Sequence, residues 1–324
     1  MNRTKSSLHS KEKGRFSISY TGDILRSLFT IIMIYRNIKP KKNEWYFILN
    51  HHLGDAFLFC SYLRKFKEMN SNPKINLLAN ESTIGVRSYF DDYFNFELLE
   101  ELPHNTGIFS DILFLLNFGL RPGRIQPSGA LYISTIRKGS FHQLDMYNRQ
   151  ALFLGLDENN KMLAIVTRSS AIPETIRDKF TSLKLKPGRT IILAPYSKSM
   201  AKIDFKWWEN IRDEAFARGY MVATNLSPKE TEITGTVPLF MKIGEILDIA
   251  ELSGYVISAR SGFCDIVLSA NCKLAILYNP STPEDFYIKK KSDNESLCKF
   301  NGFIAYDKFM KETISKIFEF FDTD

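Results

Sequence analysis

The chain has 324 residues, of which 44% are hydrophobic. This is enough apolar material for two globular cores and excludes an intrinsically disordered protein. The net charge of +7 is uneven, since residues 1–42 hold ten of the 43 basic residues and only two of the 36 acidic ones. The rest of the chain is close to neutral, which argues against a nucleic-acid-binding domain, because such a domain needs a basic face on its folded body.

The four cysteines show neither the C-x-x-C spacing of a zinc site nor the density of a disulfide framework. Reduced thiols and a cytoplasmic protein are therefore expected. The adjacent His51 and His52 do not indicate a metal site, because neighbouring side chains on a strand point to opposite faces. No metal and no cofactor are expected.

The basic N-terminal arm, residues 1–42, contains one apolar run at 24–35. This run is too short to span a bilayer, and the segment before it is too long and polar for a signal peptide. Two interpretations remain open. Residues 24–38 form a helix that packs on the body, or the basic and apolar arm rests on an anionic membrane surface.

The first half of the remaining chain alternates short apolar runs with segments of helical spacing. Its predicted strands are 45–50, 74–79 and 111–116, and its predicted helices are 56–69, 82–90 and 142–156. Gly and Pro cluster at 119–129, which predicts a loop there. We assign residues 43–167 to a first domain and the polar segment 168–188 to a linker.

The second half repeats this alternation over residues 189–306 and ends in a helix within 307–324. Its predicted strands are 190–194, 220–224, 255–259 and 273–278, and its predicted helices are 204–218, 243–250, 262–270 and 308–321. Asp204 can cap the first of these helices, and Gly219 follows its end. Two such series predict an α/β protein whose ligand lies where the carboxyl ends of the strands meet.

Three segments resemble, in the same order, the ADP-heptose:lipopolysaccharide heptosyltransferase family over residues 44–320. The first is Gly54-Asp55 followed by an apolar helix that contains Leu63-Arg64. The second is the helix that begins near His142 and ends in Leu154-Gly155-Leu156. The third combines the run from Leu193 to Lys202, Trp208, Ser261-Gly262 and Asn279-Pro280-Ser281-Thr282-Pro283.

The resemblance implies a GT-B fold, in which two Rossmann-like domains with parallel sheets face a central cleft. It also implies that the first domain binds the acceptor, that the second binds a nucleotide-sugar, and that transfer inverts the anomeric centre without a metal. The family usually has Asp-Thr/Ser-Gly-x-x-His at the donor turn, whereas this chain has Arg260 in place of the acid and Asp265 in place of the histidine. The nucleotide is therefore left open among ADP, GDP and UDP.

Inverting transfer needs a base for the acceptor hydroxyl and positive groups for the leaving diphosphate. Asp55, at a strand-to-helix turn, is the candidate base, although such an Asp can also simply cap its helix. Arg260 and the following helix start suit the diphosphate, although Arg260 could instead pair with Asp265. The predicted donor-binding residues are Ser197, Lys202, Arg260, Ser261, Gly262, Phe263 and Asp265, with Lys198 and Lys206 as alternatives to Lys202. The predicted acceptor-side residues are His51, His52, Gly54 and His142.

The predicted function is transfer of a sugar from a nucleotide-sugar to a glycan or glycolipid acceptor in lipopolysaccharide, capsule or other cell-surface polysaccharide synthesis. The enzyme would be cytoplasmic and peripheral on the inner face of the plasma membrane. The main alternative is a non-catalytic module of the same fold that binds a nucleotide-sugar or a glycan. A Rossmann oxidoreductase is disfavoured because no G-x-G-x-x-G follows an early strand.

Overall fold

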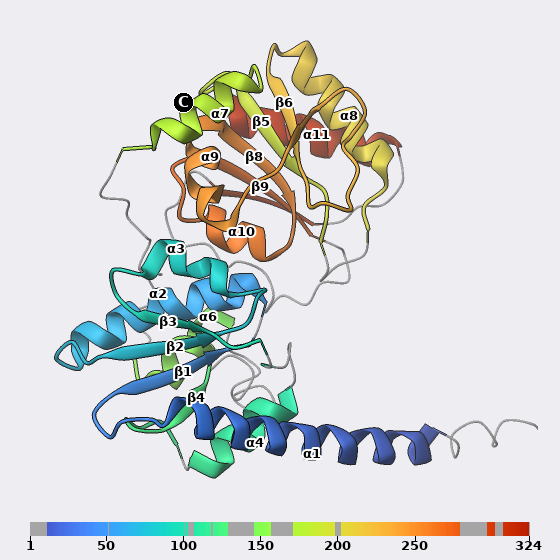
Figure 1. Ribbon diagram of the computed structural model, residues 1–324. Coiled ribbons are helices and arrows are strands. Elements are labelled where there is room, and N and C mark those ends of the chain that lie inside the picture. The colour runs from blue at the N-terminus through green and yellow to red at the C-terminus, as the bar shows by residue number, and fades with distance from the viewer. Residues whose placement is uncertain are drawn as a thin grey trace, which may run out of the picture.

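The computed structural model of the chain describes residues 12–50, 52–100, 102, 107–117, 119–128, 146–156, 171–197, 202–278, 297–301 and 307–323. Within these ranges only the backbone is described at 12–20, 146–149, 297–301 and 307–309. The described residues form two parallel sheets, each with helices on its faces (Figure 1). This is the α/β architecture of two Rossmann-like domains that the sequence predicts.

The first domain contains a four-stranded sheet in the order β3-β2-β1-β4, with all strands parallel. Its elements are α1 (Glu12–Ile38), β1 (Trp45–Leu49), α2 (Leu53–Met69), β2 (Ile75–Ala79), η1 (Ile84–Val86), α3 (Arg87–Phe90), β3 (Asn95–Leu98), α4 (Gly107–Asn117), β4 (Ile125–Pro127) and α6 (Met146–Phe153).

Strand β1 divides its apolar side chains between the two faces of this sheet, because successive side chains point in opposite directions. Phe47 and Leu49 lie in the core on the α2 side, whereas Tyr46 and Ile48 pack with α1 and α4 on the other side. All four are at least 95% buried, and β1 therefore reads as a continuous apolar run.

The second domain contains a six-stranded sheet in the order β10-β9-β8-β5-β6-β7, again with every pair parallel. Its elements are α7 (Glu174–Ser182), β5 (Thr190–Ala194), α8 (Phe205–Ala217), β6 (Met221–Asn225), β7 (Val237–Leu239), η4 (Ile243–Glu245), α9 (Ile246–Ser253), β8 (Gly254–Ala259), α10 (Gly262–Val267), β9 (Lys273–Tyr278), β10 (Leu297–Asn301) and α11 (Asp307–Asp322). Helices α8 and α11 cover one face of the sheet, and α9 and α10 cover the other.

The prediction of a strand at 111–116 is wrong, because these residues lie in helix α4. A short run of consecutive apolar residues has no period that separates a strand from a buried helix. In α4 the side chains of Phe109 and Leu113, one turn apart, enter the core, while Leu115 and Leu116 are exposed. The predicted loop at 119–129 contains the short strand β4, and strands β3, β7 and β10 were not predicted.

The segment predicted as a linker, 168–188, contains helix α7. This helix packs on α9 of the second domain, and Lys179 forms an ion pair of 2.7 Å with Glu245. Lys179 also donates a hydrogen bond of 2.6 Å to the carbonyl oxygen of Phe240. The second domain therefore begins before its first strand.

Helix α1 packs on the first domain through its C-terminal half. Ile31 and Ile34 are each 4% exposed and contribute to the core beneath the sheet. The hydroxyl of Tyr35 donates a hydrogen bond of 2.6 Å to the side chain of Asn117 on α4. One interpretation of the N-terminal arm is a helix that packs on the body. The C-terminal half of α1 does so.

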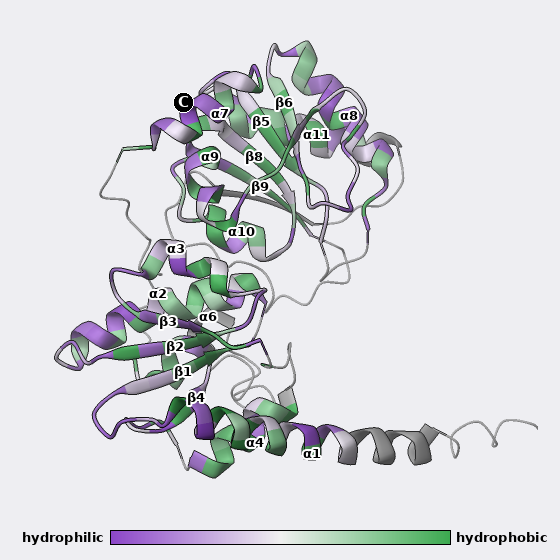
Figure 2. Ribbon diagram, viewed as in Figure 1, coloured by the Kyte–Doolittle hydropathy of each residue, from purple (hydrophilic) through white to green (hydrophobic). Residues whose placement is uncertain are grey.

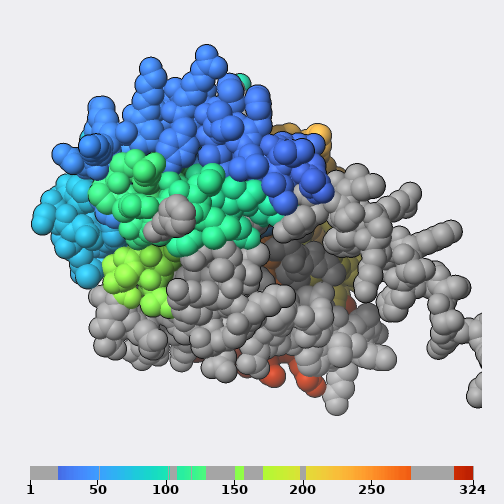
Figure 3. Space-filling view, turned by 90° about the horizontal axis from the view of Figure 1, so that it is seen from below, coloured from blue at the N-terminus to red at the C-terminus, as the bar shows by residue number. Residues whose placement is uncertain are grey.

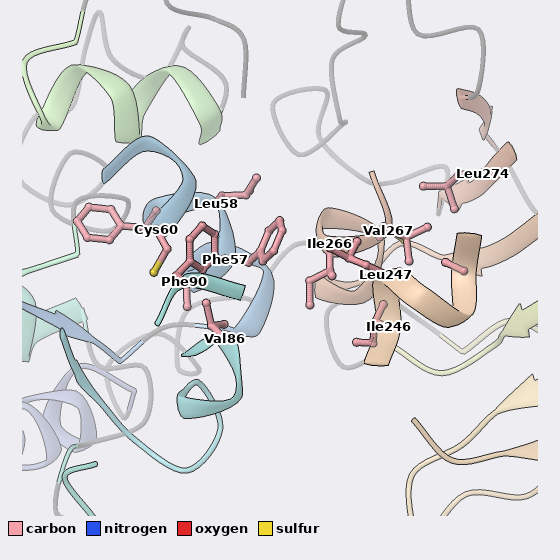
Figure 4. Packing of buried hydrophobic residues seen from close by; sticks show 14 of the residues in the cluster. Phe57, Leu58, Cys60, Val86, Phe90, Ile246, Leu247, Ile266, Val267 and Leu274 are labelled. Carbon is pink, nitrogen blue, oxygen red and sulfur yellow. The ribbon is translucent and has the colours of Figure 1, made fainter. Parts of the chain in front are cut away.

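The two domains share one buried apolar cluster. It joins side chains from α2, η1 and α3 of the first domain to side chains from α9 and α10 of the second, and Figure 4 shows these two groups opposite one another. The hydroxyl of Tyr89 donates a hydrogen bond across the same interface to the carbonyl oxygen of Ile243. The domains thus meet on one side through apolar contacts.

Glu44, just before β1, joins the amino ends of β1 and β2. Burial opposes its ionisation, but hydrogen bonds from Asn76, Tyr46, Lys74 and Lys41 outweigh burial and lower its pKa from 4.5 to about 2. A carboxyl with a lowered pKa stabilises the folded state above pH 4.5, and this contribution is lost as the pH falls toward 2.

Glu44→Gln is therefore expected to lower the free energy of unfolding at pH 7 by about 1 kcal/mol, measured by urea denaturation. The difference from the unsubstituted protein should shrink as the pH falls from 4.5 to 2. Glu68→Gln is a matched control, because the Glu68 side chain is 56% exposed in a 3.7 Å ion pair with Lys65 and should contribute little. An equal loss in both variants would contradict the role of Glu44.

Candidate functional site

The N-termini of α2 and α10 meet between the two domains. A Cβ atom on Gly54 would lie 2.7 Å from the Cα of Gly262 and 2.1 Å from Oδ2 of Asp265. A Cβ atom on Gly262 would lie 2.7 Å from the backbone nitrogen of Gly54. Only residues without a side chain allow this approach, and each glycine follows the carboxyl end of a central strand, β1 or β8.

Arg260, at the carboxyl end of β8, is held by Asp265 of α10. The two side chains form a bidentate ion pair, with both N···O distances at 3.0 Å, and they are only 11% and 3% exposed. The guanidinium also donates a hydrogen bond of 2.5 Å to the carbonyl oxygen of Ser261. Of the two roles considered for Arg260, the pair with Asp265 is thus present, and it fixes the plane of the guanidinium.

Asp55 lies in the first turn of α2, opposite this pair. Burial raises the pKa of its carboxyl above the usual 3.8, while His52, Arg260 and a hydrogen bond with the His52 backbone act in the other direction. That hydrogen bond is the helix-capping contact expected for an acid three residues after the N-cap, which is His52. Asp55 therefore caps its helix and also lies within electrostatic reach of Arg260.

Two serines lie at the same turn. Ser261 occupies the N-cap position of α10 but makes no capping hydrogen bond, and its buried hydroxyl has no hydrogen-bond partner. Ser197, in the loop after β5, donates a hydrogen bond of 2.7 Å to the carbonyl oxygen of Arg260. The carboxyl ends of the neighbouring strands β5 and β8 are thereby linked, whereas the buried Ser261 hydroxyl makes no hydrogen bond.

Neither Lys202 nor Lys206, two of the lysines considered for donor binding, makes an observed contact with this turn. Lys202 is exposed, and its Nζ lies 4.7 Å from the ring centroid of Phe205. Lys206 is exposed and lies 3.7 Å from Glu209. Phe263 is partly buried and packs against the core shared by the domains, so it lines the interface beside Gly262.

Several predicted site residues lie outside the described residues, namely His51, His142 and Lys198. His52 is exposed, and its charge opposes the rise of the Asp55 pKa that burial causes. The tryptophan pair Trp207 and Trp208 is 2% and 0% exposed and belongs to the core of the second domain.

Sequence reasoning missed two carboxamides at the carboxyl edge of the first sheet. Asn50 follows β1 and Asn80 follows β2, and the register of these strands places them side by side. Asn50 is fully buried with neither side-chain atom hydrogen-bonded, and the Asn80 Nδ2 also has no partner. The sequence does carry a signal for them, because each Asn directly follows an apolar strand. A polar side chain buried at that position normally has a hydrogen-bond partner, so an Asn without one within the protein indicates a ligand contact.

The site combines a carboxylate of raised pKa, a fixed guanidinium, an unpartnered hydroxyl and the positive ends of two helices. A carboxylate with a raised pKa suits proton abstraction, and the other groups suit an anion. Within the described part of the chain, no three His, Cys, Asp or Glu side chains are grouped in a way that could hold a metal ion.

Comparison with known proteins gives no matching family model and no matching curated sequence. Among solved structures, a family 9 glycosyl transferase from Veillonella parvula is 14% identical with a TM-score of 0.59, covering 87% of this chain and 98% of its own. ADP-heptose lps heptosyltransferase II of E. coli is 12% identical with a TM-score of 0.59, covering 86% and 98%.

A third solved structure, heptosyltransferase WaaC of E. coli with ADP, is 11% identical with a TM-score of 0.55, covering 85% of this chain and 99% of its own. At these identities the likeness establishes the fold. The chain has the GT-B fold, and the predicted likeness to heptosyltransferases is confirmed at that level.

Proposed function

We propose that the protein is a glycosyltransferase that moves a sugar from a nucleotide-sugar to an acceptor hydroxyl. The observation that carries this proposal is the placement of Asp55 within electrostatic reach of Arg260. The two residues come from different domains: Arg260 directly follows β8, and Asp55 lies in the first turn of the helix that follows β1. In open α/β sheets this is where ligands bind, and the GT-B fold of the solved neighbours supports the same reaction class.

In the proposed reaction Asp55 takes the proton from the acceptor hydroxyl, whose oxygen attacks the anomeric carbon as the bond to the nucleoside diphosphate breaks. A single displacement of this kind inverts the anomeric centre. The guanidinium of Arg260, oriented by Asp265, and the Ser261 hydroxyl would stabilise the leaving diphosphate without a metal. Because the backbones of Gly54 and Gly262 touch, the substrates must lie beside this contact and not within it.

The proposed donor is an ADP-, GDP- or UDP-sugar, and the solved neighbours include heptosyltransferase WaaC with ADP and TibC in complex with ADP-D-beta-D-heptose. The proposed acceptor is a lipid- or polymer-linked glycan used in lipopolysaccharide or other cell-surface polysaccharide synthesis. We place the enzyme on the cytoplasmic face of the plasma membrane. On the proposed acceptor-side domain, the Asn50 side chain and the Asn80 Nδ2, which lack hydrogen-bond partners, suit a ligand rich in hydroxyl groups.

A second candidate is a module of the same fold that binds a nucleotide-sugar without turning it over. The observation that favours it is the ion pair itself, since Asp265 neutralises much of the charge that Arg260 could offer to a diphosphate. Screening ADP-, GDP- and UDP-sugars by thermal shift, followed by assay of nucleotide release, separates the candidates. Binding with release supports the transferase, binding without release supports the module, and absence of binding to any donor contradicts both.

Asp55→Asn is expected to lower kcat for transfer by about 100-fold or more, since a positioned general base contributes roughly that factor. The acid limb of the pH profile of kcat/KM, which should lie above pH 3.8 because the pKa of Asp55 is raised, should disappear. Donor binding, measured by thermal shift, should change less than about twofold.

The same variant should be more stable than the unsubstituted protein at pH 7. A carboxyl whose pKa is raised by folding stabilises the folded state below pH 3.8, and that contribution is lost as the pH rises through the folded-state pKa. Asparagine avoids the burial of this charge and can still accept the hydrogen bond from the His52 backbone. Full turnover with an unchanged acid limb would remove Asp55 from the mechanism.

A further inference from the structure

One flank of helix α1 is apolar and uncovered. Leu25, Phe29 and Ile32 are 64%, 66% and 64% exposed, and their spacing of four and three residues aligns them along the helix. They lie on a different face from Ile31 and Ile34, which pack into the core. The hydropathy colouring of α1 in Figure 2 shows the apolar residues along this described part of the helix.

Helix α4 also carries exposed leucines. It packs beside α1, and its Leu115 and Leu116 are 58% and 51% exposed. Figure 3 shows the two helices next to one another on one face of the molecule. We call the exposed side chains of Leu25, Phe29, Ile32, Leu115 and Leu116 the apolar face, and clustered exposure of this kind marks an interaction surface.

Basic residues border the apolar face. Exposed cations lie on α1, in the loop after it and in the loop after α4, at Arg26, Arg36, Lys39, Lys42, Arg121 and Arg124. The two loops are adjacent, because a Cβ atom on Gly123 would lie 2.8 Å from the Cα of Lys42. The acids on these two helices among residues with described side chains are Asp23 and Asp111, both partly buried.

We propose that the apolar face docks on an anionic lipid bilayer, with α1 and α4 lying in the plane of the interface. Large apolar side chains bordered by arginine and lysine are what such a surface binds. Five more basic residues precede residue 21 and add to the same charge. A second copy of the chain is a poorer partner, because a symmetric contact would bring the two basic borders together.

The docking is parallel to the surface. Helix α1 has 27 residues and is thus about 40 Å long at 1.5 Å per residue. No helix in the described ranges is both long enough and apolar enough to cross a bilayer. The apolar face lies on the first domain, on the side away from the second domain (Figure 1), so docking would leave the interdomain site open to soluble donors. Docking on a bilayer does not depend on sugar transfer and can be measured without it.

The test is sedimentation of the full chain with vesicles of phosphatidylcholine alone and with vesicles containing 30% phosphatidylglycerol. The chain is expected to bind the anionic vesicles at least about tenfold more tightly, and added salt should weaken binding. The variant Leu25→Ser/Phe29→Ser/Ile32→Ser should lose at least about tenfold in affinity. Its thermal unfolding should be unchanged, because all three side chains are exposed.

A matched control is Phe216→Ser/Phe240→Ser, which removes two phenylalanines that are 43% and 53% exposed on the second domain. This variant should bind as the unsubstituted chain does. If the triple variant does not fold, Arg26→Glu/Arg36→Glu provides an independent test and should weaken binding to anionic vesicles only. The proposal would be overturned if the chain bound both vesicle types equally or bound neither. It would also be overturned if the triple variant changed from dimer to monomer without any loss of vesicle binding.

Discussion

Replacing Gly54 by alanine is expected to lower glycosyl transfer by at least about 100-fold, since displacement of about 1 Å at a reacting centre can cost that much. The added Cβ atom would lie 2.1 Å from Oδ2 of Asp265 and 2.7 Å from the Cα of Gly262. The second of these is a backbone atom at a helix N-terminus, which cannot turn aside as a flexible side chain can. Helices α2 and α10 must therefore separate, and Asp55 moves away from Arg260.

Overpacking of this kind usually costs about 1–3 kcal/mol, so the variant should fold with a lower Tm. Small-angle scattering should show a larger radius of gyration if the domains part. Gly22→Ala is the control, because a Cβ atom at Gly22 meets nothing within 4 Å and alanine favours a helix. A Gly54→Ala protein with unchanged kcat/KM would show that the contact between the two glycines is not needed for transfer.

Replacing Arg260 by methionine is expected to destabilise the protein by about 3–5 kcal/mol, because one partner of a buried ion pair is left without compensation. Asp265 is only 3% exposed, and Asp55 would lose a positive charge that now opposes the rise of its pKa caused by burial. Urea denaturation measures the loss of stability. The rate of nucleotide release should also fall, because the proposed contact between Arg260 and the diphosphate is removed.

The double variant Arg260→Met/Asp265→Leu separates the two effects. Replacing both partners of a buried pair by apolar side chains is often neutral or stabilising, so most of the lost stability should return while transfer remains low. Arg260→Lys retains the charge but not the bidentate geometry and should be intermediate in both measurements. If the double variant recovered transfer as well as stability, Arg260 would be a structural residue only.

Much of this arrangement could be predicted from the sequence where the local signals agree. The runs at 45–50 and 255–259 are largely apolar, and each leads through a glycine-containing segment into a helix. This pattern is typical of a buried parallel strand followed by a ligand-binding turn. The meeting of Gly54 with Gly262 could not be read in the same way, because it depends on how two domains pack and not on either segment alone.

The errors also have physical causes. Residues 111–116 are consecutive and apolar, so no periodicity distinguishes α4 from a strand. Strands β3, β4 and β7 have only three or four residues each, too short for an alternating pattern to show. The choice between a ligand contact and an ion pair for Arg260 needed side-chain geometry, because residues 260 and 265 are adjacent only once the turn has folded into α10.

The apolar cluster shared by the two domains limits how the domains can move relative to one another. Complete separation of the two domains would expose side chains such as Phe57 and Ile266 to water, and each of these is now at most 1% exposed. The free-energy cost rises with the apolar area that becomes exposed. A rotation about this cluster, with the contact between Gly54 and Gly262 opening and closing, would expose fewer apolar side chains. Substrate entry and product exit would then accompany this rotation, while the shared apolar cluster keeps the two domains in contact.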